Sequence, residues 1–266
     1  MASPPMLYEF ISLTDTGRLR SNNEDAVACE ASLGLAVLAD GMGGYNAGEV
    51  ASAMATGTVS TALGTWLLAH QGNTTARETS IAMRLSVERA NQVIYQASLD
   101  NSEFAGMGTT LVVAVFSGAR ALIGHVGDSR CYRWRKGQLS QLTRDHSLLQ
   151  EQLDAGLLSP QAAQHVPYRN LVTRALGVEN EVALDVGEHV VSPGDLFLLC
   201  SDGLTDMLPD ESIAQLLKNT TPDDNLPQTL VDAANAAGGK DNISVIVVRA
   251  TGGRPKRSLL PRWWMR

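Results

Sequence analysis

The chain of 266 residues is long enough to bury a full core, and 44% hydrophobic with 18% charged residues suit a folded protein rather than a disordered one. No apolar run is long enough to cross a bilayer, and the N-terminus lacks the basic and apolar segments of a signal peptide, so we expect a cytoplasmic protein. The net charge of −7 combines a basic end, residues 254–266, with a more acidic body, which argues against nucleic acid as a partner and suits the binding of cations.

Apolar and β-branched runs predict strands, and longer amphipathic stretches predict helices. In chain order we predict a strand over 33–39, helices over 49–68 and 76–98, strands over 110–116 and 121–126, a hairpin over 131–142, strands over 182–191 and 196–200, helices over 210–219 and 226–237, and a strand over 243–248. The polar, partly helical residues 147–170 interrupt the strands as a surface excursion. Because strands group with strands and helices with helices, mostly antiparallel sheets covered by helices are favoured over regular βαβ alternation.

Acidic residues recur where the predicted strands begin or end. Asp40 ends the apolar run "LAVLAD" and is followed by Gly41, and the run "LFLLCSD" ends in the same way at Asp202. The other acids at such boundaries are Glu24, Asp25, Asp128 and Asp241. Each of them alone is most simply a turn-forming residue beside a strand. As a set, converging carboxylates would repel one another unless a cation neutralised them, so the pattern predicts a metal site.

The residue types indicate which metal and which reaction to expect. Oxygen ligands favour Mg²⁺ or Mn²⁺ over zinc, because the five histidines are scattered without zinc-site spacing. The glycines beside the acids are expected to make room for a hydrated ion. A pair of such ions would activate water and clamp a phosphoryl group, and Arg20, four residues before Glu24, offers a donor for phosphate. Without Glu24 and Asp25 nearby, Arg20 would be interpreted as a solvated surface residue.

Seven segments, in order along nearly the whole chain, resemble the metal-dependent (type 2C) serine/threonine protein phosphatases, specifically their compact bacterial branch. They are "GRLRSNNEDAV", "LADGMGGYNAGEVAS", "GMGTTLVVAV", "HVGDSRCYRWRKGQLSQLTRDHS", "RNLVTRALG", "LLCSDGLTDML" and "GGKDNISVIVV". The resemblance implies an α+β fold, a four-layer α/β/β/α sandwich of two mostly antiparallel β-sheets flanked by helices. It also implies that residues 147–170 form the flap of the family. We predict one catalytic domain over 1–252 and a flexible basic tail over 253–266.

The resemblance also assigns the ligands of the first metal. Asp40 resembles the acid that bridges two metals, and the carbonyl of Gly41 would bind one of them. Asp202 and Asp241 resemble the other ligands of the first metal. These residues are therefore the expected centre of the site.

The second metal, the third metal and the phosphate are assigned in the same way. Glu24 and Asp25 resemble the acids that hold the second metal through water. Asp128 resembles the residue that binds a third, weaker metal, and Arg20 resembles the arginine that binds substrate phosphate. Asp145, in "TRDHS", is interpreted as structural. The expected cofactors are two core Mn²⁺ or Mg²⁺ ions and a third ion.

The implied activity is hydrolysis of phosphoserine and phosphothreonine by direct attack of a metal-activated water, with Arg20 and Asp40 as catalytic residues. The implied partners are phosphorylated proteins and an opposing bacterial serine/threonine kinase, and we expect a monomer. Two positions depart from the pattern of the family. Met42 stands where animal members have a histidine proposed as general acid, and Tyr45 stands where bacterial members usually have a histidine.

Other catalytic classes lack the residues that they need. None of the three cysteines precedes an arginine by six positions, as a cysteine phosphatase requires, and their number and spacing predict no disulfide framework. Gly239-Lys240 is followed by Asp241 rather than the serine or threonine of a P-loop, and Asn46 replaces the third glycine of a dinucleotide fingerprint. The alternative left open is a catalytically silent phosphopeptide-binding or scaffolding member of the same fold.

The basic tail allows two interpretations. Its five positive charges, together with Trp263 and Trp264, suit contact with an anionic membrane surface or with an acidic patch on a partner. The simpler interpretation is a disordered, solubilising end.

Overall fold

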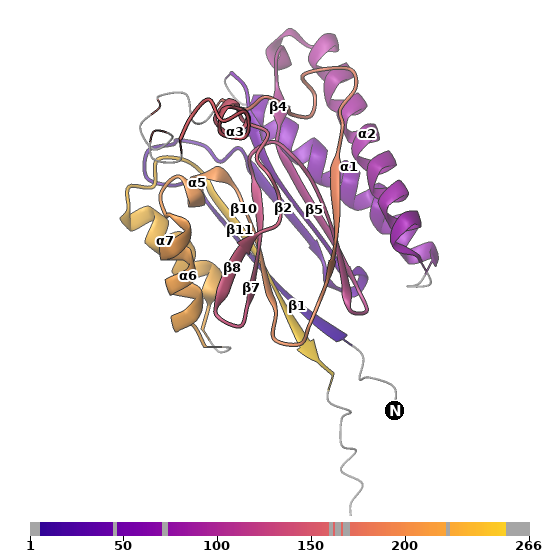
Figure 1. Ribbon diagram of the computed structural model, residues 1–266. Helices are drawn as coiled ribbons and strands as arrows, with labels where there is room; N and C mark the ends of the chain where they lie inside the picture. The colour runs from indigo at the N-terminus through magenta and orange to yellow at the C-terminus, as the bar shows by residue number, and fades with distance from the viewer. Residues whose placement is uncertain are drawn as a thin grey trace, which may run out of the picture.

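Two β-sheets pack face to face, and helices cover the outer surface of each sheet (Figure 1). The computed structural model describes residues 6–44, 47–70, 74–159, 162, 166, 171–221 and 224–253. Within these ranges, neighbouring strands of both sheets pair in antiparallel fashion. The layers confirm the expected α+β sandwich of two antiparallel sheets flanked by helices.

The first sheet joins the two ends of the described chain. Its strand order is β1 (Met6–Asp15), β11 (Ile243–Gly252), β10 (Leu196–Cys200), β7 (Arg130–Arg135) and β8 (Gln138–Gln141). The strands β1 and β11 pair along their whole length, from Met6 opposite Gly252 to Asp15 opposite Ile243. The second sheet has the order β2 (Asp25–Glu30), β3 (Leu35–Met42), β5 (Leu111–Ser117), β6 (Arg120–Val126) and β9 (Asp185–Val190), and the short β4 (Gly108–Thr109) pairs with the end of β3.

Helices form the two outer layers. α1 (Ala47–His70) and α2 (Ala76–Asp100) cover the second sheet, while α5 (Asp202–Thr205), α6 (Asp210–Asn219) and α7 (Leu226–Ala236) cover the first (Figure 1). The shorter α3 (Leu148–Asp154) begins the predicted flap, and one-turn 3₁₀ helices occupy η1 (Ala31–Leu33) and η2 (Ser102–Phe104). Side chains fix where two helices begin: Thr75 forms a reciprocal capping box with Glu78 at α2, and Ser147 accepts a hydrogen bond from the Gln150 N–H at α3.

Three apolar layers separate the four layers of secondary structure. Along β3, Leu35, Val37 and Ala39 pack against α1 and α2, whereas the alternate residues Ala36 and Leu38 pack between the sheets. The residues of β10 alternate in the same way between the inter-sheet core and the layer of α5, α6 and α7. Since both faces of these strands are buried, their sequences are continuous apolar runs rather than alternating ones.

Most predicted elements are confirmed, and two have the predicted bounds, β10 over Leu196–Cys200 and α6 over Asp210–Asn219. The predicted hairpin is β7 and β8, with Gly137 at a φ of 83° in its turn. The strand predicted over 182–191 corresponds to β9, which is shorter and spans Asp185–Val190. The strands β1 and β2 are not predicted: β1 alternates between half-buried and exposed residues and has no continuous apolar run.

Some expectations concern residues that the structure does not describe. Tyr45, most of the flap after residue 159, and the basic residues 254–266 lie outside the described residues. The three cysteines, Cys29, Cys131 and Cys200, are free thiols, as predicted from their number and spacing. No helix in the described ranges has the length and hydropathy needed to cross a membrane.

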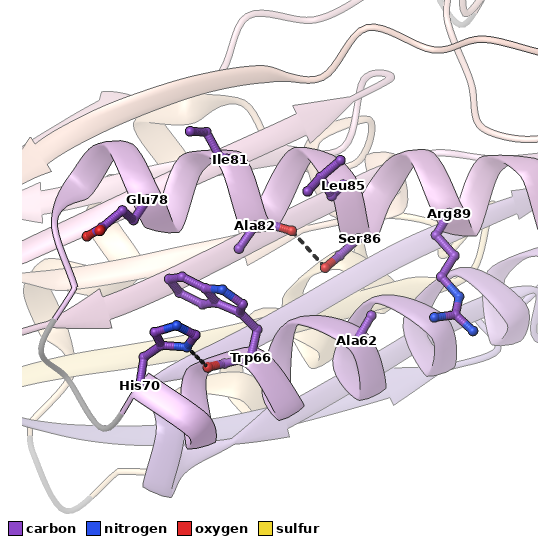
Figure 2. A pocket seen from close by; sticks show the side chains of 9 residues that line it. All are labelled: Ala62, Trp66, His70, Glu78, Ile81, Ala82, Leu85, Ser86 and Arg89. Atoms are coloured by element: carbon purple, nitrogen blue, oxygen red, sulfur yellow. Dashed lines mark hydrogen bonds between the residues drawn. The ribbon is translucent and has the colours of Figure 1, made fainter.

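Figure 2 shows a hollow on the outer side of the molecule, between the end of α1 and the first half of α2. Trp66 and His70 stack there with ring centroids 4.3 Å apart, and His70 Nδ1 lies 2.7 Å from the Trp66 carbonyl oxygen. Ile81 and Leu85 project from α2 and stay exposed. The carboxylate that lines this hollow, Glu78, is used to cap α2. The hollow therefore does not collect the acids of the predicted metal site.

One buried asparagine ties α2 to the loop that follows the flap. The side chain of Asn91 is 1% exposed, and its amide donates hydrogen bonds to the carbonyls of Glu179 and Asn180 at 2.9 and 3.0 Å. Its side-chain oxygen accepts a hydrogen bond from the N–H of Gly177 at 2.7 Å. Three backbone groups of the loop thus depend on this one side chain.

Replacing this asparagine tests how firmly the loop is held. Asn91→Ala should lower the free energy of unfolding by about 2–3 kcal/mol, because the loop loses three buried hydrogen bonds. Urea unfolding measures the change, and Gln96→Ala, an exposed position on the same helix, should change it by less than about 0.5 kcal/mol. Equal effects of the two substitutions would contradict the anchoring role of Asn91.

Candidate active site

The predicted acids gather in one pocket at the end of the sandwich. A cavity of about 360 Å³ is lined by Arg20, Glu24, Asp40, Gly41, Met42, Gly43, Thr110, Asp128, Val172, Asp202 and Asp241. Asp25 lies beside them, because it is the residue opposite Asp40 in the pairing of β2 and β3. The structure therefore brings together all of the site residues expected from the sequence.

The antiparallel topology explains why these residues meet. β2 begins with Asp25 at the edge where β3 ends, so Asp25 and Asp40 face each other. In the other sheet, Asp202 follows the end of β10 and Asp241 precedes the start of the neighbouring β11. Asp128 lies in the connection between β6 and β7, which passes from one sheet to the other. The pocket is thus built across the junction of the two sheets.

Hydrogen bonds hold the backbone of Asp40 in place. Its N–H donates to the Thr110 hydroxyl at 3.1 Å, and its carbonyl accepts from the Thr110 N–H and from the Thr109 hydroxyl, both at 2.8 Å. The Thr110 and Ser129 hydroxyls lie 2.7 Å apart, which extends this support to the segment that carries Asp128. The backbone of Asp40 is therefore held by side chains from "GMGTT" and, through Ser129, from "GDSR".

The glycines beside the acids allow close backbone packing. A Cβ atom on Gly41 would lie 2.0 Å from the Gly48 carbonyl oxygen, and one on Gly203 would lie 2.0 Å from the Asn242 carbonyl oxygen. Both positions therefore require glycine for packing at the start of α1 and of β11.

Asp25 is buried and only partly satisfied. Its Oδ2 atom accepts a hydrogen bond from the Ser201 hydroxyl at 2.8 Å, while its buried Oδ1 atom has no hydrogen-bond partner. Burial, and then the nearby charge of Asp241, raises the pKa of Asp25 to about 6. A buried carboxylate oxygen without a partner is costly unless a cation binds it.

The same physical cause affects the other acids in the pocket. Burial raises the pKa of Asp40 well above its ordinary value, and the charges of Asp25 and Asp202 add to this effect. Burial and the charge of Asp128 raise the pKa of Asp202 in the same direction. The pKa of Asp128 itself rises to about 7, mainly through burial. These shifts describe a cluster of carboxylates whose negative charge is under-compensated by the protein.

Arg20 supplies positive charge at the rim of the pocket. One of its guanidinium nitrogens, Nη2, donates to Asp241 Oδ2 at 2.8 Å, and 48% of its side chain is exposed. An arginine carries five N–H donors, so this contact leaves donors that can face the pocket. Asp241 therefore holds the Arg20 guanidinium beside the acids through one of its nitrogens.

Two residues that the sequence analysis did not single out position this part of the site. The Asn242 side chain accepts a hydrogen bond from the Glu24 N–H at 2.7 Å and donates to the carbonyls of Thr16 and Asn22, both at 2.9 Å. Ser201 connects Asp25 of one sheet to the strand end of the other. The signal for both was present, since each lies directly beside a predicted acid in "CSDG" and "KDNIS".

A second group of titratable side chains lies near the pocket. Ligand atoms of His125, His146 and Asp185 lie within 4.8 Å of one another, which is a geometry that could hold an ion. However, His146 Nδ1 accepts from the Gly127 N–H and its Nε2 lies 3.1 Å from Asp185 Oδ2. Arg174 Nη1 lies 3.4 Å from Asp185 Oδ1 and provides a positive charge there. We interpret this group as a hydrogen-bonded support of the residues that follow the flap, since His146 also accepts a backbone hydrogen bond from Thr173 and the Arg174 guanidinium supplies the positive charge.

Asp145 has the structural role that was expected. Both of its carboxylate oxygens accept from Arg130, at distances of 2.6 to 3.0 Å, and Gln141 donates to it at 2.9 Å. These contacts fix the β7–β8 hairpin against the segment that leads to the flap.

Comparison with known proteins places this chain in a family. Residues 18–232 match the family model described as protein phosphatase 2C. The chain is 38% identical to the serine/threonine phosphatase stp of Listeria monocytogenes over 240 residues, which cover 88% of this chain and 93% of that protein. It is 39% identical to the protein phosphatase PhpP of Streptococcus pneumoniae over 243 residues, covering 90% and 96% of the two chains.

A solved structure extends the similarity to three dimensions. The catalytic domain of the serine/threonine protein phosphatase PstP, in complex with two manganese ions, superposes with a TM-score of 0.79 at 33% identity. The match covers 92% of this chain and 99% of that domain.

The raised pKa of Asp128 leads to a pH-dependent stability of the metal-free protein. A carboxyl group whose folded pKa, about 7, exceeds its ordinary value of 3.8 stabilises the fold at low pH and loses this contribution as pH rises through 7. In EDTA at pH 8, the free energy of unfolding of Asp128→Asn should therefore be higher than that of the wild type by roughly 1–4 kcal/mol. Near pH 4 the two proteins should be equally stable.

Urea unfolding at pH 4, 6 and 8 measures this difference. Asp232→Asn, on the exposed surface of α7, is the matched control and should give no gain at pH 8. An Asp128→Asn protein that is less stable than the wild type at pH 8 would show that this carboxylate is better compensated than its surroundings indicate.

Proposed function

The chain belongs to the protein phosphatase 2C family, and from this premise we propose that the acidic pocket at the end of the sandwich is where this serine/threonine phosphatase acts. Its substrates are phosphoserine and phosphothreonine residues of proteins, and it opposes a bacterial serine/threonine kinase. The observation that carries the assignment of the site is the convergence of buried, under-compensated carboxylates around one cavity with Arg20 at its rim.

The residues of the pocket fit divalent cations. The unpartnered Oδ1 atom of Asp25 and the raised pKa values of Asp25, Asp40 and Asp202 show carboxylates that the protein's own groups do not neutralise, which suits them to cations. Hard oxygen donors suit Mn²⁺ or Mg²⁺, and the two manganese ions of the related PstP structure support this choice. We propose that Asp40, Asp202, Asp241 and the Gly41 carbonyl hold the first ion.

The remaining acids complete the proposed ligand set. Glu24 and Asp25 would hold the second ion through water, together with the bridging Asp40. Asp128 and Asp202 would bind a third ion more weakly. When bound, such ions supply a nucleophile from water at neutral pH and neutralise the oxygens of the phosphoryl group.

The protein's own side chains position the substrate. Arg20 is held by Asp241, and its remaining N–H groups are free to donate to phosphate oxygens in the planar geometry that an arginine offers. Thr109 and Thr110 hold the backbone of Asp40, from which its carboxylate reaches the pocket. Among the described residues that line the pocket there is no histidine, and Met42 lies where a general acid would be expected.

The proposal extends to the domain organisation, oligomeric state and location of the protein. We propose that residues 1–252 form one catalytic domain, since the family match spans most of that range, and that 253–266 form a flexible basic tail. We also propose a monomer that acts in the cytoplasm. A catalytically silent binding module is disfavoured, because each expected metal-ligating acid is present and the relatives are named phosphatases.

Removal of a central ligand tests the metal assignment. Asp40→Asn should lower kcat for p-nitrophenyl phosphate by about a hundredfold or more while the protein remains folded, because the bridging charge is lost. EDTA should abolish wild-type activity, and added Mn²⁺ should restore it. Asp232→Asn, an exposed acid on α7, should leave kcat unchanged. Wild-type turnover in Asp40→Asn would falsify the assignment of this residue.

Arg20 is tested separately, because it should act on the phosphate rather than on the metals. Arg20→Ala should raise KM and reduce kcat/KM by about a hundredfold, the loss expected for roughly 2–3 kcal/mol of charge-assisted hydrogen bonds. Arg20→Lys keeps the charge but not the planar guanidinium, so its kcat/KM should lie between those of the wild type and Arg20→Ala. Calorimetry should still detect two tightly bound Mn²⁺ ions in Arg20→Ala. An unchanged KM in Arg20→Ala would remove Arg20 from substrate binding.

A further inference from the structure

A groove continues directly from the acidic pocket. It has a volume of about 640 Å³ and is lined, among others, by Met42, Val172, Arg174, Val178, Glu179 and Glu181. Met42 and Val172 also line the acidic pocket, so the two cavities share a boundary. We call this cavity the flanking groove. Any chain that carries a phosphorylated residue into the acidic pocket must leave that pocket, and the flanking groove offers a continuous path.

The walls of the flanking groove are fixed relative to Asp40. Leu176 and Thr109 exchange two backbone hydrogen bonds of 2.9 and 3.0 Å, and the Thr109 hydroxyl also donates to the Asp40 carbonyl. On the other side, Asn91 of α2 holds Gly177 and the following carbonyls. The loop that forms the wall is therefore anchored both to the candidate catalytic centre and to the helical layer. A preformed wall lowers the ordering cost of binding an extended segment.

The surface of the flanking groove is partly apolar. The side chain of Val178 is 53% exposed, and Met42 and Val172 adjoin it from the acidic pocket. A Cβ atom on Gly108 would lie 2.8 Å from Val178 Cγ2 and 3.7 Å from Met42 Cγ, so the lack of a side chain at Gly108 lets Val178 and Met42 approach each other over its backbone. This surface suits the aliphatic part of a long side chain.

The charge of the flanking groove is negative at its rim. Glu179 and Glu181 are both exposed there. The positive charge of Arg174 is already matched, since its guanidinium lies 3.4 Å from Asp185 and donates to the Ala183 carbonyl at 3.2 Å. An incoming side chain thus meets apolar walls and two carboxylates, which favours lysine or arginine over an acidic residue.

We propose that the flanking groove binds the residues adjacent to the phosphorylated residue of a protein substrate, and that Glu179 and Glu181 select a basic side chain among them. This proposal rests on the proposed phosphatase activity of the acidic pocket. In this proposal the loop over 176–183 determines which substrates are preferred, while the acids of the pocket take part in the reaction.

The experiment uses the full chain with Mn²⁺ and a set of phosphothreonine peptides. Within the set, lysine or glutamate occupies in turn each of the three positions before and after the phosphothreonine, and phosphate release gives kcat/KM. The wild type should prefer lysine over glutamate by roughly fivefold at one or more of these positions, mainly through KM, as expected for two solvent-exposed charge contacts. Raising the salt concentration should reduce the preference.

Two variants link the preference to the flanking groove. Glu179→Gln with Glu181→Gln should remove it, and Glu179→Lys with Glu181→Lys should reverse it toward glutamate. The matched control is Glu30→Lys with Glu211→Lys, which makes the same change in net charge at exposed positions on β2 and α6 and should keep the wild-type preference.

The outcomes separate this proposal from the one on which it rests. A wild type that does not hydrolyse p-nitrophenyl phosphate in the presence of Mn²⁺ would overturn the proposed function and the groove proposal with it. A wild type that hydrolyses p-nitrophenyl phosphate but treats lysine and glutamate peptides alike would overturn the groove proposal alone. Retention of the lysine preference in the Glu179→Lys, Glu181→Lys protein would also overturn it.

Discussion

The mutual repulsion of carboxylates gathered at one end of the sandwich is the constraint on which the rest of the structure depends. Asp25, Asp40, Asp128 and Asp202 all have raised pKa values because burial and neighbouring negative charge act together. A loop could relax such a conflict by moving its side chains apart. Here Asp25 and Asp40 lie in paired strands, while Asp128 and Asp202 follow the ends of β6 and β10 within two residues. The repulsion therefore persists unless the carboxylates take up protons or bind a cation.

Both sheets contribute segments that carry these acids. Asp25 and Asp40 belong to strands of one sheet, whereas Asp202 follows β10 and Asp241 precedes β11 of the other. Ser201 and Asn242 join the two sides through hydrogen bonds that cross the junction. Any sliding of one sheet over the other would therefore change the spacing of the ligands, and the inter-sheet core of interlocked apolar side chains, with rings such as Phe116 and Phe197, opposes such sliding.

The sequence predicts the centre of the site better than its supports. Asp40 and Asp202 could be found because continuous apolar runs end at them, and the same runs located β3 and β10. β1 was not found, since its residues alternate between half-buried and exposed and its stability depends on pairing with β11 at the far end of the chain. Likewise, no local pattern predicts that the Asn91 side chain hydrogen-bonds a loop 86 to 89 residues away. Nor does one predict that Met42 and Val178 line the same groove. Such contacts depend on the tertiary arrangement, which a local pattern does not contain.

The pairing of β1 with β11 has a consequence for how the molecule is made. β1 occupies one edge of its sheet, and its neighbour, β11, lies farthest along the sequence among the strands that the structure describes. During synthesis β1 must wait until residues 243–252 have been made before its hydrogen-bonding partner emerges, and contacts of such long sequence separation form slowly. Asp241, at the start of β11, arrives at the same late moment. A nascent chain therefore cannot bring its complete set of pocket acids together until β11 has been made and has paired with β1.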